Sequence, residues 1–278
     1  LINILGEQKL VKGRIDKIIL YGSYARGGWV DEPHTAKGYR SDFDLLIIVN
    51  DKRLTDKIDF WSKLEDRLTR ELAIDKTLHT PVNFIVHTLQ EVNDGLAHGR
   101  YFFMDVARDG IALYEYDDKE LHQPKPKTPE QALAMAREYF EEWFPAAMKR
   151  FGGAQYYREQ GHFKDAAFDT HQAVERLYHC VLLVCTFYTP HVHNLGFLRT
   201  QAERIDMRLV DAWPRALKAD RARFEKLKEA YVKARYSKHY RISEADLLWL
   251  ATHVEELGRA VQAICSERIA ALEDRAGL

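Results

Sequence analysis

The chain has 278 residues, enough for one or two domains with a sizeable core in each. Its 41 basic and 42 acidic side chains give a formal net charge of -1, which excludes a uniformly basic surface that binds nucleic acid in bulk. The three cysteines, Cys180, Cys185 and Cys265, form no Cys-x-x-Cys pair, so the sequence predicts neither a disulfide framework nor a zinc site.

Two features of the composition indicate where the protein works. Unpaired cysteines are typical of a reducing compartment, so we expect a cytoplasmic protein. The longest apolar stretch, residues 180–188, is far shorter than the ~20 residues that a membrane-spanning helix needs. No contact with a membrane is therefore expected.

The first strong pattern is an apolar strand, expected over 17–21, that ends at Gly22-Ser23. Because glycine lets backbone N–H groups approach a ligand closely, this ending predicts a sharp turn that faces a phosphate. A helix is expected to start there, and its N-terminus would favour the same anion.

The next pattern is Ser41-Asp42-Phe43-Asp44, which opens a strand expected over 42–49. Side chains alternate along a strand, so Asp42 and Asp44 share one face while Phe43 points to the other. Two carboxylates this close are costly to bury together unless a cation lies between them. The pair therefore predicts a metal site.

At these residues the sequence resembles the nucleotidyltransferase superfamily of the DNA polymerase β type. The small members of that superfamily carry Gly-Ser, a helix and then Asp-x-Asp on the next strand, in the order found here. The resemblance implies an α+β domain, residues 1–122, with a mixed β-sheet. The segment from Trp29 to Arg40 is longer than in the smallest members and is expected to form an extended hairpin at the mouth of the site.

The resemblance also implies a reaction. A nucleoside monophosphate, AMP from ATP in the first instance, passes from a nucleoside triphosphate to a small-molecule or protein acceptor, and pyrophosphate leaves. Asp42 and Asp44 would be the catalytic residues and the ligands of Mg²⁺. The residues that would bind the nucleotide, the arginines through charge-assisted contacts, are Gly22, Ser23, Arg26 and Arg40.

Active members usually add a third carboxylate on a neighbouring strand, and the matching position here is Asn83. An amide coordinates Mg²⁺ through its oxygen but cannot accept a proton near neutral pH, so a second metal ion should bind weakly. The base would then come from the second domain or from His87, which shares a strand face with Asn83.

In the rest of the first domain, helices are expected over 55–72, 89–98 and 101–108, and strands over 81–86 and 111–116. Thr55 is the expected N-cap of the first of these helices, and Gly110 suits the C-terminal cap of another. A charged, proline-containing stretch at 117–127 then marks the boundary to a second domain, residues 128–278.

The second domain opens with Thr128-Pro129-Glu130-Gln131, which has the form of a capped helix start. The pattern then stays helical over 129–160, 162–188, 194–205, 214–236 and 243–272, which predicts an all-α antiparallel bundle. The stretches 166–178 and 189–195 resemble HEPN domains, helical bundles that are often fused to minimal nucleotidyltransferases. A homodimer formed through this bundle is compatible with the resemblance.

Many HEPN domains are ribonucleases that use an Arg, four to six residues and then a His. Arg235 and His239 are one residue short of that spacing, so RNA is not the favoured partner. We expect Arg235, His239 and Tyr240, in a basic and tyrosine-rich stretch, to contact the acceptor or a phosphate instead. Arg235 and His239 would then lie one helical turn apart.

Two groups of histidines are weaker candidates. His171 and His179 lie two helical turns apart on one expected helix, where packing is the commoner role. His191 and His193 are separated by one residue and have no acidic neighbour in the sequence, which favours a loop over a metal site.

Three classes of function remain open. The first is a nucleotidyltransferase that modifies a small molecule or a protein, with the helical domain on the acceptor side. The second is a nucleotide-binding regulatory module whose transferase site is weakened, as Asn83 permits. The third is a HEPN ribonuclease controlled by the attached transferase domain.

Overall fold

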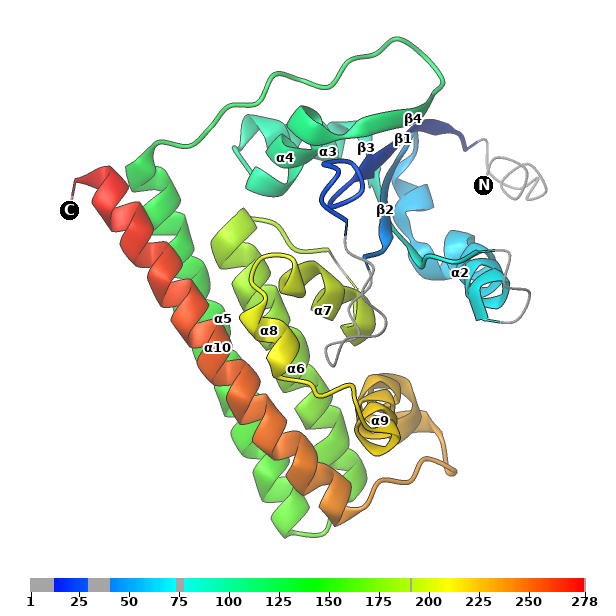
Figure 1. Ribbon diagram of the computed structural model, residues 1–278, viewed down its shortest axis with the longest axis vertical. Coiled ribbons are helices and arrows are strands. Elements are labelled where there is room, and N and C mark those ends of the chain that lie inside the picture. Colours follow the sequence, from blue (N-terminus) through cyan, green and yellow to red (C-terminus); the bar gives the residue numbers. More distant parts are fainter. Residues whose placement is uncertain (1–12, 30–40, 74–77, 191, 278) are drawn as a thin grey trace. The chain divides into compact units, whose positions relative to one another are not determined.

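A computed structural model describes residues 13–29, 41–73, 78–190 and 192–277 of the chain (Figure 1). It divides into two compact units, one that ends at Pro126 and one that begins at Lys127. The first unit holds a β-sheet with helices, and the second is helical. Within these ranges, none of the helices has the length and apolar character that a membrane crossing requires.

The first unit is built on a four-stranded sheet with the strand order β3-β2-β1-β4. Its strands are β1 (Ile15–Tyr21), β2 (Phe43–Val49), β3 (Val82–Thr88) and β4 (Ile111–Glu115). β2 runs antiparallel to β1 and parallel to β3, and β4 pairs antiparallel with β1 at the edge. The sheet is therefore mixed, as the sequence predicts.

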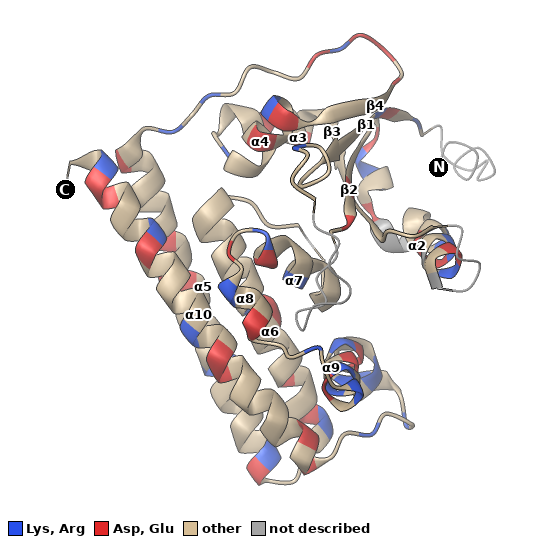
Figure 2. Cartoon of the chain, in the orientation of Figure 1, with Lys and Arg blue, Asp and Glu red and all other residues tan. Residues whose placement is uncertain are grey.

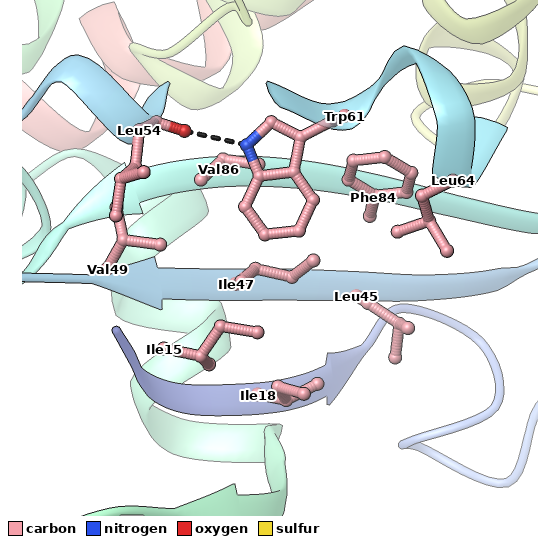
Figure 3. Close-up of a cluster of buried hydrophobic side chains, with 10 residues drawn as sticks. All are labelled: Ile15, Ile18, Leu45, Ile47, Val49, Leu54, Trp61, Leu64, Phe84 and Val86. Carbon is pink, nitrogen blue, oxygen red and sulfur yellow. Dashed lines mark hydrogen bonds between the residues drawn. The ribbon is translucent and has the colours of Figure 1, made fainter. Parts of the chain in front are cut away.

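Helices follow β2 and β3 and cover the two faces of the sheet. They are η1 (Lys52–Thr55), α2 (Lys57–Ala73), α3 (Leu89–Ala97) and α4 (Tyr101–Asp109). The buried indole of Trp61 lies on one face, and its Nε1 donates to the Leu54 carbonyl over 2.6 Å (Figure 3). The apolar side chains packed there are Ile15, Ile18, Leu45, Ile47, Val49, Leu54, Leu64, Phe84 and Val86.

Of the two helix caps expected in this unit, one differs from the sequence-based expectation and one agrees with it. Thr55 does not cap α2 but ends η1, where its hydroxyl donates to the Lys52 carbonyl. Asp51 starts that turn earlier, because its carboxylate accepts the backbone N–H of Arg53, and hydrogen bonds from Arg53 lower the pKa of Asp51 to about 2. Gly110 is the C-cap of α4, as expected, and its φ of −68° is an ordinary one. A Cβ at this position would meet the Val106 carbonyl at 2.3 Å, so close packing requires the glycine.

The second unit consists of helices joined by turns, which are α5 (Pro129–Glu159), α6 (Phe163–Thr186), α7 (Leu195–Glu203), α8 (Arg208–Asp211), α9 (Lys218–Tyr236) and α10 (Glu244–Ala276). Thr128 and Ser243 form the predicted capping boxes of α5 and α10. The short α8 is absent from the sequence-based prediction, and α9 begins at Lys218 where the sequence suggested Pro214.

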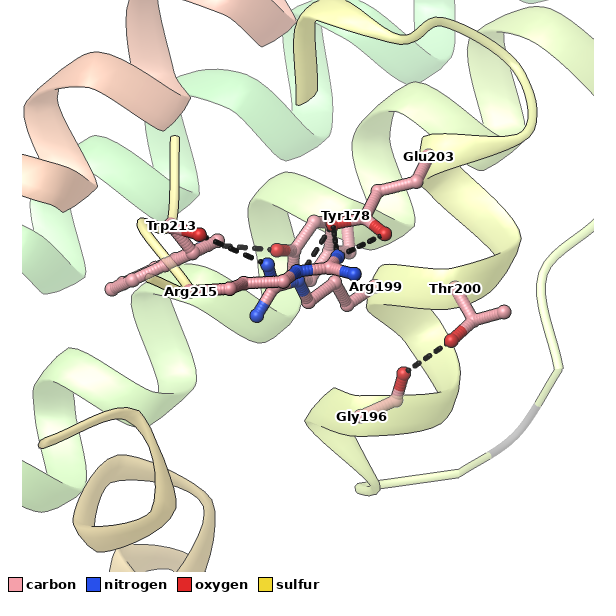
Figure 4. A network of polar contacts seen from close by, with 7 residues as sticks. All are labelled: Tyr178, Gly196, Arg199, Thr200, Glu203, Trp213 and Arg215. Carbon is pink, nitrogen blue, oxygen red and sulfur yellow. Dashed lines mark hydrogen bonds and ion pairs between the residues drawn. The ribbon is translucent and has the colours of Figure 1, made fainter. Parts of the chain in front are cut away.

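The long helices α5, α6 and α10 run side by side and α9 packs on α6, which forms the predicted bundle (Figure 1). A buried polar network joins α6, α7 and the segment after α8 (Figure 4). In it, Glu203 accepts hydrogen bonds from Arg199 and Arg215, and the Trp213 indole donates to the Tyr178 hydroxyl over 2.8 Å. The charged groups join α7 to the segment after α8, and the Trp213–Tyr178 hydrogen bond joins that segment to α6.

Candidate active site

The predicted site residues of the first unit meet at one end of the sheet. β1 ends where β2 and β3 begin, because β1 is antiparallel to β2 and β2 is parallel to β3. Asp44 pairs with Tyr21 on one side and with Asn83 on the other. Paired residues point to the same face of a sheet, so three strands contribute to one polar patch.

Gly22 begins the turn after β1 with φ at +80°, a left-handed conformation that glycine adopts at little cost. The backbone closes on itself here, since Arg26 N–H donates to the Gly22 carbonyl and Gly28 N–H to the Ser23 carbonyl. The helix expected after Gly22-Ser23 is wrong, because residues 23–27 form turns instead. An anion at this point would meet the N–H groups of a turn without the dipole of a helix.

The hydroxyl of Ser23 is a buried polar atom that lacks a hydrogen-bond partner among the described residues. A buried hydroxyl without a partner costs about 1–3 kcal/mol, so such groups usually have a ligand or a functional reason. Its position directly after Gly22 fits the oxygen of a bound phosphate.

Asp42 and Asp44 lie on the same side of β2 but differ in exposure. Asp44 is fully buried between the paired strands, whereas Asp42 precedes the strand and is half-buried. The Asn83 amide donates to Asp42 Oδ2 over 2.8 Å, which places the expected third position beside the acidic pair. The amide nitrogen faces the carboxylate, so in this arrangement Asn83 supports Asp42 as a hydrogen-bond donor.

His87 is too far away to act as the base at this site. It shares the face of Asn83, as expected, but the two lie four positions apart on an extended strand, about 13 Å at 3.3 Å per residue. Its Nδ1 lies 3.2 Å from Glu91 Oε2 and its ring packs edge-on against Phe103. This contact lowers the pKa of Glu91 to about 2. His87 therefore holds the carboxylate of the capping box that starts α3.

Of the two predicted arginines, Arg40 lies outside the described residues. Arg26 is exposed in the turn. The pKa of Asp109 is lowered, chiefly by its hydrogen bond from Arg108 and to a smaller extent by the charge of Arg26. Arg26 is therefore close to the end of α4 and keeps an exposed guanidinium near the Gly22–Ser23 turn.

The sequence-based prediction missed an aromatic group at the same end of the sheet. Tyr24 lies with its ring centroid 4.2 Å from that of Phe43, and it stacks on Trp29 at 5.6 Å with only 2° between the ring planes. The signal was present, since aromatic residues stand next to Ser23 and between the two aspartates.

Two family models match the chain. A model described as polymerase beta, nucleotidyltransferase matches residues 1–93, and a HEPN domain model matches residues 140–264. The chain carries a polymerase β-type nucleotidyltransferase domain followed by a HEPN domain. The two resemblances seen in the sequence are thereby confirmed.

Among solved structures, the chain is similar to a nucleotidyltransferase-like protein from Exiguobacterium sibiricum 255-15. The sequence identity is 15%, the TM-score is 0.31, and the match covers 91% of this chain and 72% of that chain. A comparison with curated proteins found no match. The assignment therefore depends on the two domain models.

The nucleotidyltransferase domain offers an ion two carboxylates and few other ligands. Among the described residues, no three His, Cys, Asp or Glu side chains come together as a metal-binding group. Mg²⁺ commonly binds through one or two carboxylates together with substrate phosphates. Asp42, Asp44 and the unpartnered Ser23 hydroxyl fit an ion that binds jointly with a triphosphate.

In the HEPN domain, the three residues expected to contact an acceptor have different surroundings. α9 ends at Tyr236, so Arg235 and His239 do not lie one helical turn apart as expected. Tyr240 is buried and its hydroxyl donates to the Lys226 carbonyl over 2.9 Å, which removes it from contact with a ligand. The expectation for Tyr240 is therefore wrong, because the side chain anchors the turn after α9.

The basic stretch around these residues is largely neutralised by acidic neighbours. Figure 2 shows Lys and Arg alternating with Asp and Glu along α9. Lys226 pairs with Asp246, and Lys233 pairs with Glu229. Arg235 instead lies over aromatic rings, with its guanidinium carbon 4.6 Å from the Tyr231 ring centroid and 4.8 Å from that of Phe168.

A buried carboxylate, Glu175 of α6, gathers the histidines that the sequence left unassigned. His193 Nδ1 lies 3.1 Å from Glu175 Oε2, and His171 Nδ1 lies 3.7 Å from the same oxygen. His179 Nε2 lies 3.9 Å from Glu175 Oε1. His193 therefore does have an acidic partner, and the i, i+4, i+8 spacing on α6 was the signal that could have revealed it.

This cluster of Glu175, His171, His179 and His193 carries shifted pKa values. Burial raises the pKa of Glu175, although the hydrogen bond from His193 opposes the shift. Burial lowers the pKa of His171 to about 3, and neither of its ring nitrogens has a hydrogen-bond partner among the described residues. His193 is the exposed member and stacks on Tyr231 at 4.3 Å.

Proposed function

We propose that the nucleotidyltransferase domain transfers a nucleoside monophosphate, AMP from ATP in the first instance, to a hydroxyl group of a small-molecule or protein acceptor. The observation that carries this proposal is the meeting of the Gly22–Ser23 turn with Asp42 and Asp44 at one end of the sheet. A phosphate-binding turn beside paired carboxylates matches what a triphosphate and its cation require. Free cysteines support a reducing, cytoplasmic setting for this reaction.

Each residue has a defined role in the proposed reaction. The N–H groups of the turn and the Ser23 hydroxyl hold the terminal phosphates, and the exposed guanidinium of Arg26 adds charge to them. Asp42 and Asp44 would hold Mg²⁺, which neutralises charge on the phosphates and stabilises the in-line displacement when bound. Asn83 keeps Asp42 oriented through its 2.8 Å hydrogen bond.

A weakened, regulatory version of the same site is the second candidate. The specific observation in its favour is that Asn83 donates to Asp42 where active relatives usually place a third carboxylate. His87, the base that the sequence suggested in this domain, lies about 13 Å along the strand from Asn83 and so does not stand beside the acidic pair. Such a site would bind nucleotide and Mg²⁺ but turn over slowly.

Two measurements separate these candidates. Nucleotide titration with and without Mg²⁺ tests binding, and pyrophosphate release from labelled ATP in the presence of candidate acceptors tests transfer. Transfer predicts release that depends on the acceptor and is lost in Asp42→Asn but kept in Asp105→Asn, which alters an exposed carboxylate on α4. Binding with no release for any acceptor would instead support the regulatory module.

A ribonuclease in the HEPN domain is a third candidate, favoured by the cluster around Glu175. His193 is held by Glu175 and shares the Tyr231 ring with Arg235, which supplies a cation for a phosphodiester. His193 would take the proton of a ribose 2′-hydroxyl while the 2′-oxygen bonds to phosphorus, and the 5′-oxygen would leave with a proton taken from water.

RNA cleavage by the purified protein tests this candidate. Loss of cleavage in His193→Ala, with cleavage retained in His239→Ala and in Asp42→Asn, would support it. Absence of cleavage by the wild-type protein, or loss in His239→Ala alone, would contradict it.

A further inference from the structure

The segment that joins the two domains is attached to the first of them. Residues 117–128 form neither helix nor strand between β4 and α5 (Figure 1). Two of their backbone N–H groups nevertheless donate to α3. The His122 N–H bonds to Asn93 Oδ1 over 2.8 Å, and the Lys125 N–H bonds to the Leu96 carbonyl over 3.0 Å. The linker is therefore fixed to α3 at two points.

The burial pattern of the linker indicates its conformation. Leu121 and Pro124 are half-buried, whereas the residues between them are exposed. The two donors, His122 and Lys125, are three positions apart as well. A period of three residues is that of a polyproline II helix, which proline favours. We call this extended stretch, residues 121–126, the strap.

The two acceptors on α3 suit an extended strap. Three residues of polyproline II advance about 9 Å, whereas three residues of α-helix rise about 4.5 Å. The Asn93 side chain tilts back toward the start of α3 and the Leu96 carbonyl points toward its end, so the acceptors lie farther apart than their Cα atoms. Asn93, which is only 8% exposed, thereby supplies the acceptor that the strap needs at its first contact.

The strap has little else to hold it. Most of its side chains are exposed, and within the described part of the chain its backbone makes the two hydrogen bonds to α3. Segments with exposed side chains and few backbone hydrogen bonds open locally at much lower free energy than global unfolding requires. The strap is therefore able to leave α3 while both domains stay folded.

We propose that the strap is a detachable device that sets the length of the tether between the two domains. When it is docked, residues 126–128 separate Lys125 from the start of α5, and they span about 10 Å at most. When it is undocked, residues 117–128 are free and span about 40 Å. The length of a tether sets the effective concentration of one domain around the other, so undocking changes how strongly the two domains can influence each other.

Hydrogen exchange of the full chain, resolved to single amides by mass spectrometry, tests the docking. In the wild type, the N–H groups of His122 and Lys125 should exchange more slowly than that of the neighbouring Gln123. Asn93→Ala removes the acceptor of His122 alone. Because the strap docks as one unit, protection should fall at both His122 and Lys125, by roughly 2- to 12-fold, the range expected for one hydrogen bond.

Three further variants make this result specific. Asn93→Asp keeps an acceptor oxygen and should keep the protection of both amides. Gln90→Ala changes an exposed amide on the same helix and should also leave the protection unchanged. Pro124→Gly leaves α3 intact but gives the strap more conformational freedom, so both amides should lose protection.

Two exchange results would overturn the strap. Loss of protection at His122 alone in Asn93→Ala would show two independent contacts. Unchanged protection at both amides in Pro124→Gly would show that the strap does not dock as an extended unit.

Small-angle X-ray scattering of the full chain tests the tether. The double variant Asn93→Ala with Pro124→Gly should have a larger maximum dimension than the wild type, by up to about 30 Å, and a broader distribution of distances. Asn93→Asp should scatter as the wild type does. Wild-type scattering from a double variant that has lost protection at both amides would overturn the proposal, because the tether length would then not depend on the strap.

Discussion

The nucleotidyltransferase domain carries its acidic pair at the start of a strand, whereas the HEPN domain carries the buried carboxylate Glu175 on a helix. Strand pairing brings Asp44 beside Asn83 from a segment about forty residues away. In the HEPN domain, the helical repeat stacks His171, Glu175 and His179 along α6, and a loop adds His193.

The two arrangements also differ in how their polar groups meet the solvent. The acidic pair of the nucleotidyltransferase domain has one half-buried member, Asp42, which a ligand can reach. Glu175 is shielded, and His193, with 57% of its side chain exposed, is the exposed member of its cluster. The first arrangement suits binding of a cation with its ligand, and the second suits proton transfer through a single exposed ring.

The largest expected effect is a loss of stability in acid caused by His171. The pKa of His171 falls from 6.5 to about 3 on folding, chiefly through burial. Between these values the unfolded chain binds one more proton, so the free energy of unfolding falls by up to about 1.4 kcal/mol for each pH unit of acidification. Urea unfolding at several pH values should show that the free energy of unfolding falls steeply on the acid side, which we call the acid limb. The fall should be shallower in His171→Phe.

Glu175 acts in the opposite direction and provides the control. Its pKa is raised on folding, so it favours the folded state in acid, and this contribution is lost as the pH rises through the folded pKa. Glu175→Gln should therefore steepen the acid limb. An acid limb that is the same in His171→Phe and in the wild type would contradict the assignment to His171.

The next effect concerns Asn83→Asp, which adds a third carboxylate to the acidic pair. Without Mg²⁺ the variant loses the donor to Asp42 Oδ2 and gains a repelling charge, at a cost of about 1–3 kcal/mol. Mg²⁺ should restore the lost stability. Thermal unfolding of the variant in chelator and in MgCl₂ measures this difference. Asn83→Ala, which adds no charge, should not respond; an equal response of both variants would mean that the ion binds elsewhere.

A smaller effect is expected for Tyr240→Phe, which removes the hydroxyl that donates to the Lys226 carbonyl. Loss of this bond should cost about 0.5–1.5 kcal/mol of stability without changing ATP affinity. Tyr236→Phe, at a ring that is 76% exposed, is the matched control and should change neither quantity. Weaker ATP binding at unchanged stability would restore Tyr240 as a ligand contact.

The smallest effect is expected for His239→Ala. His239 is exposed after the end of α9, so the variant should unfold within about ±0.5 kcal/mol of the wild type. Chemical unfolding at pH 7 measures this difference. A loss well above that range would show that His239 packs into the turn and is structural.

Much of the fold and the acidic pair could be predicted because their signals are local. The alternation around Phe43 places Asp42 and Asp44 on one face, and the Thr128 and Ser243 capping boxes mark two helix starts. Such patterns depend on backbone periods that nearby residues determine. Asn83 came from the family resemblance, which places a third position on a neighbouring strand, and the parallel pairing of β2 and β3 sets it beside Asp44.

What the sequence could not provide depends on turns and loops. The turn after Gly22 replaces the expected helix because its N–H groups close on the Gly22 and Ser23 carbonyls. The contact of His193 with Glu175 requires the path of the loop between α6 and α7. The stacking of Trp29 on Tyr24 likewise depends on how a turn folds back.

The most direct test of the central claim is Mg²⁺-dependent binding of a non-hydrolysable ATP analogue, measured by calorimetry in the wild type, Asp42→Asn, Asp44→Asn and the double variant. Because both carboxylates hold one ion, each single variant should lose the Mg²⁺-dependent part of the affinity, and the double variant should lose no more. Asp105→Asn, which alters a half-exposed carboxylate on α4, should bind as the wild type does. Wild-type Mg²⁺-dependent affinity in both single variants would contradict the account.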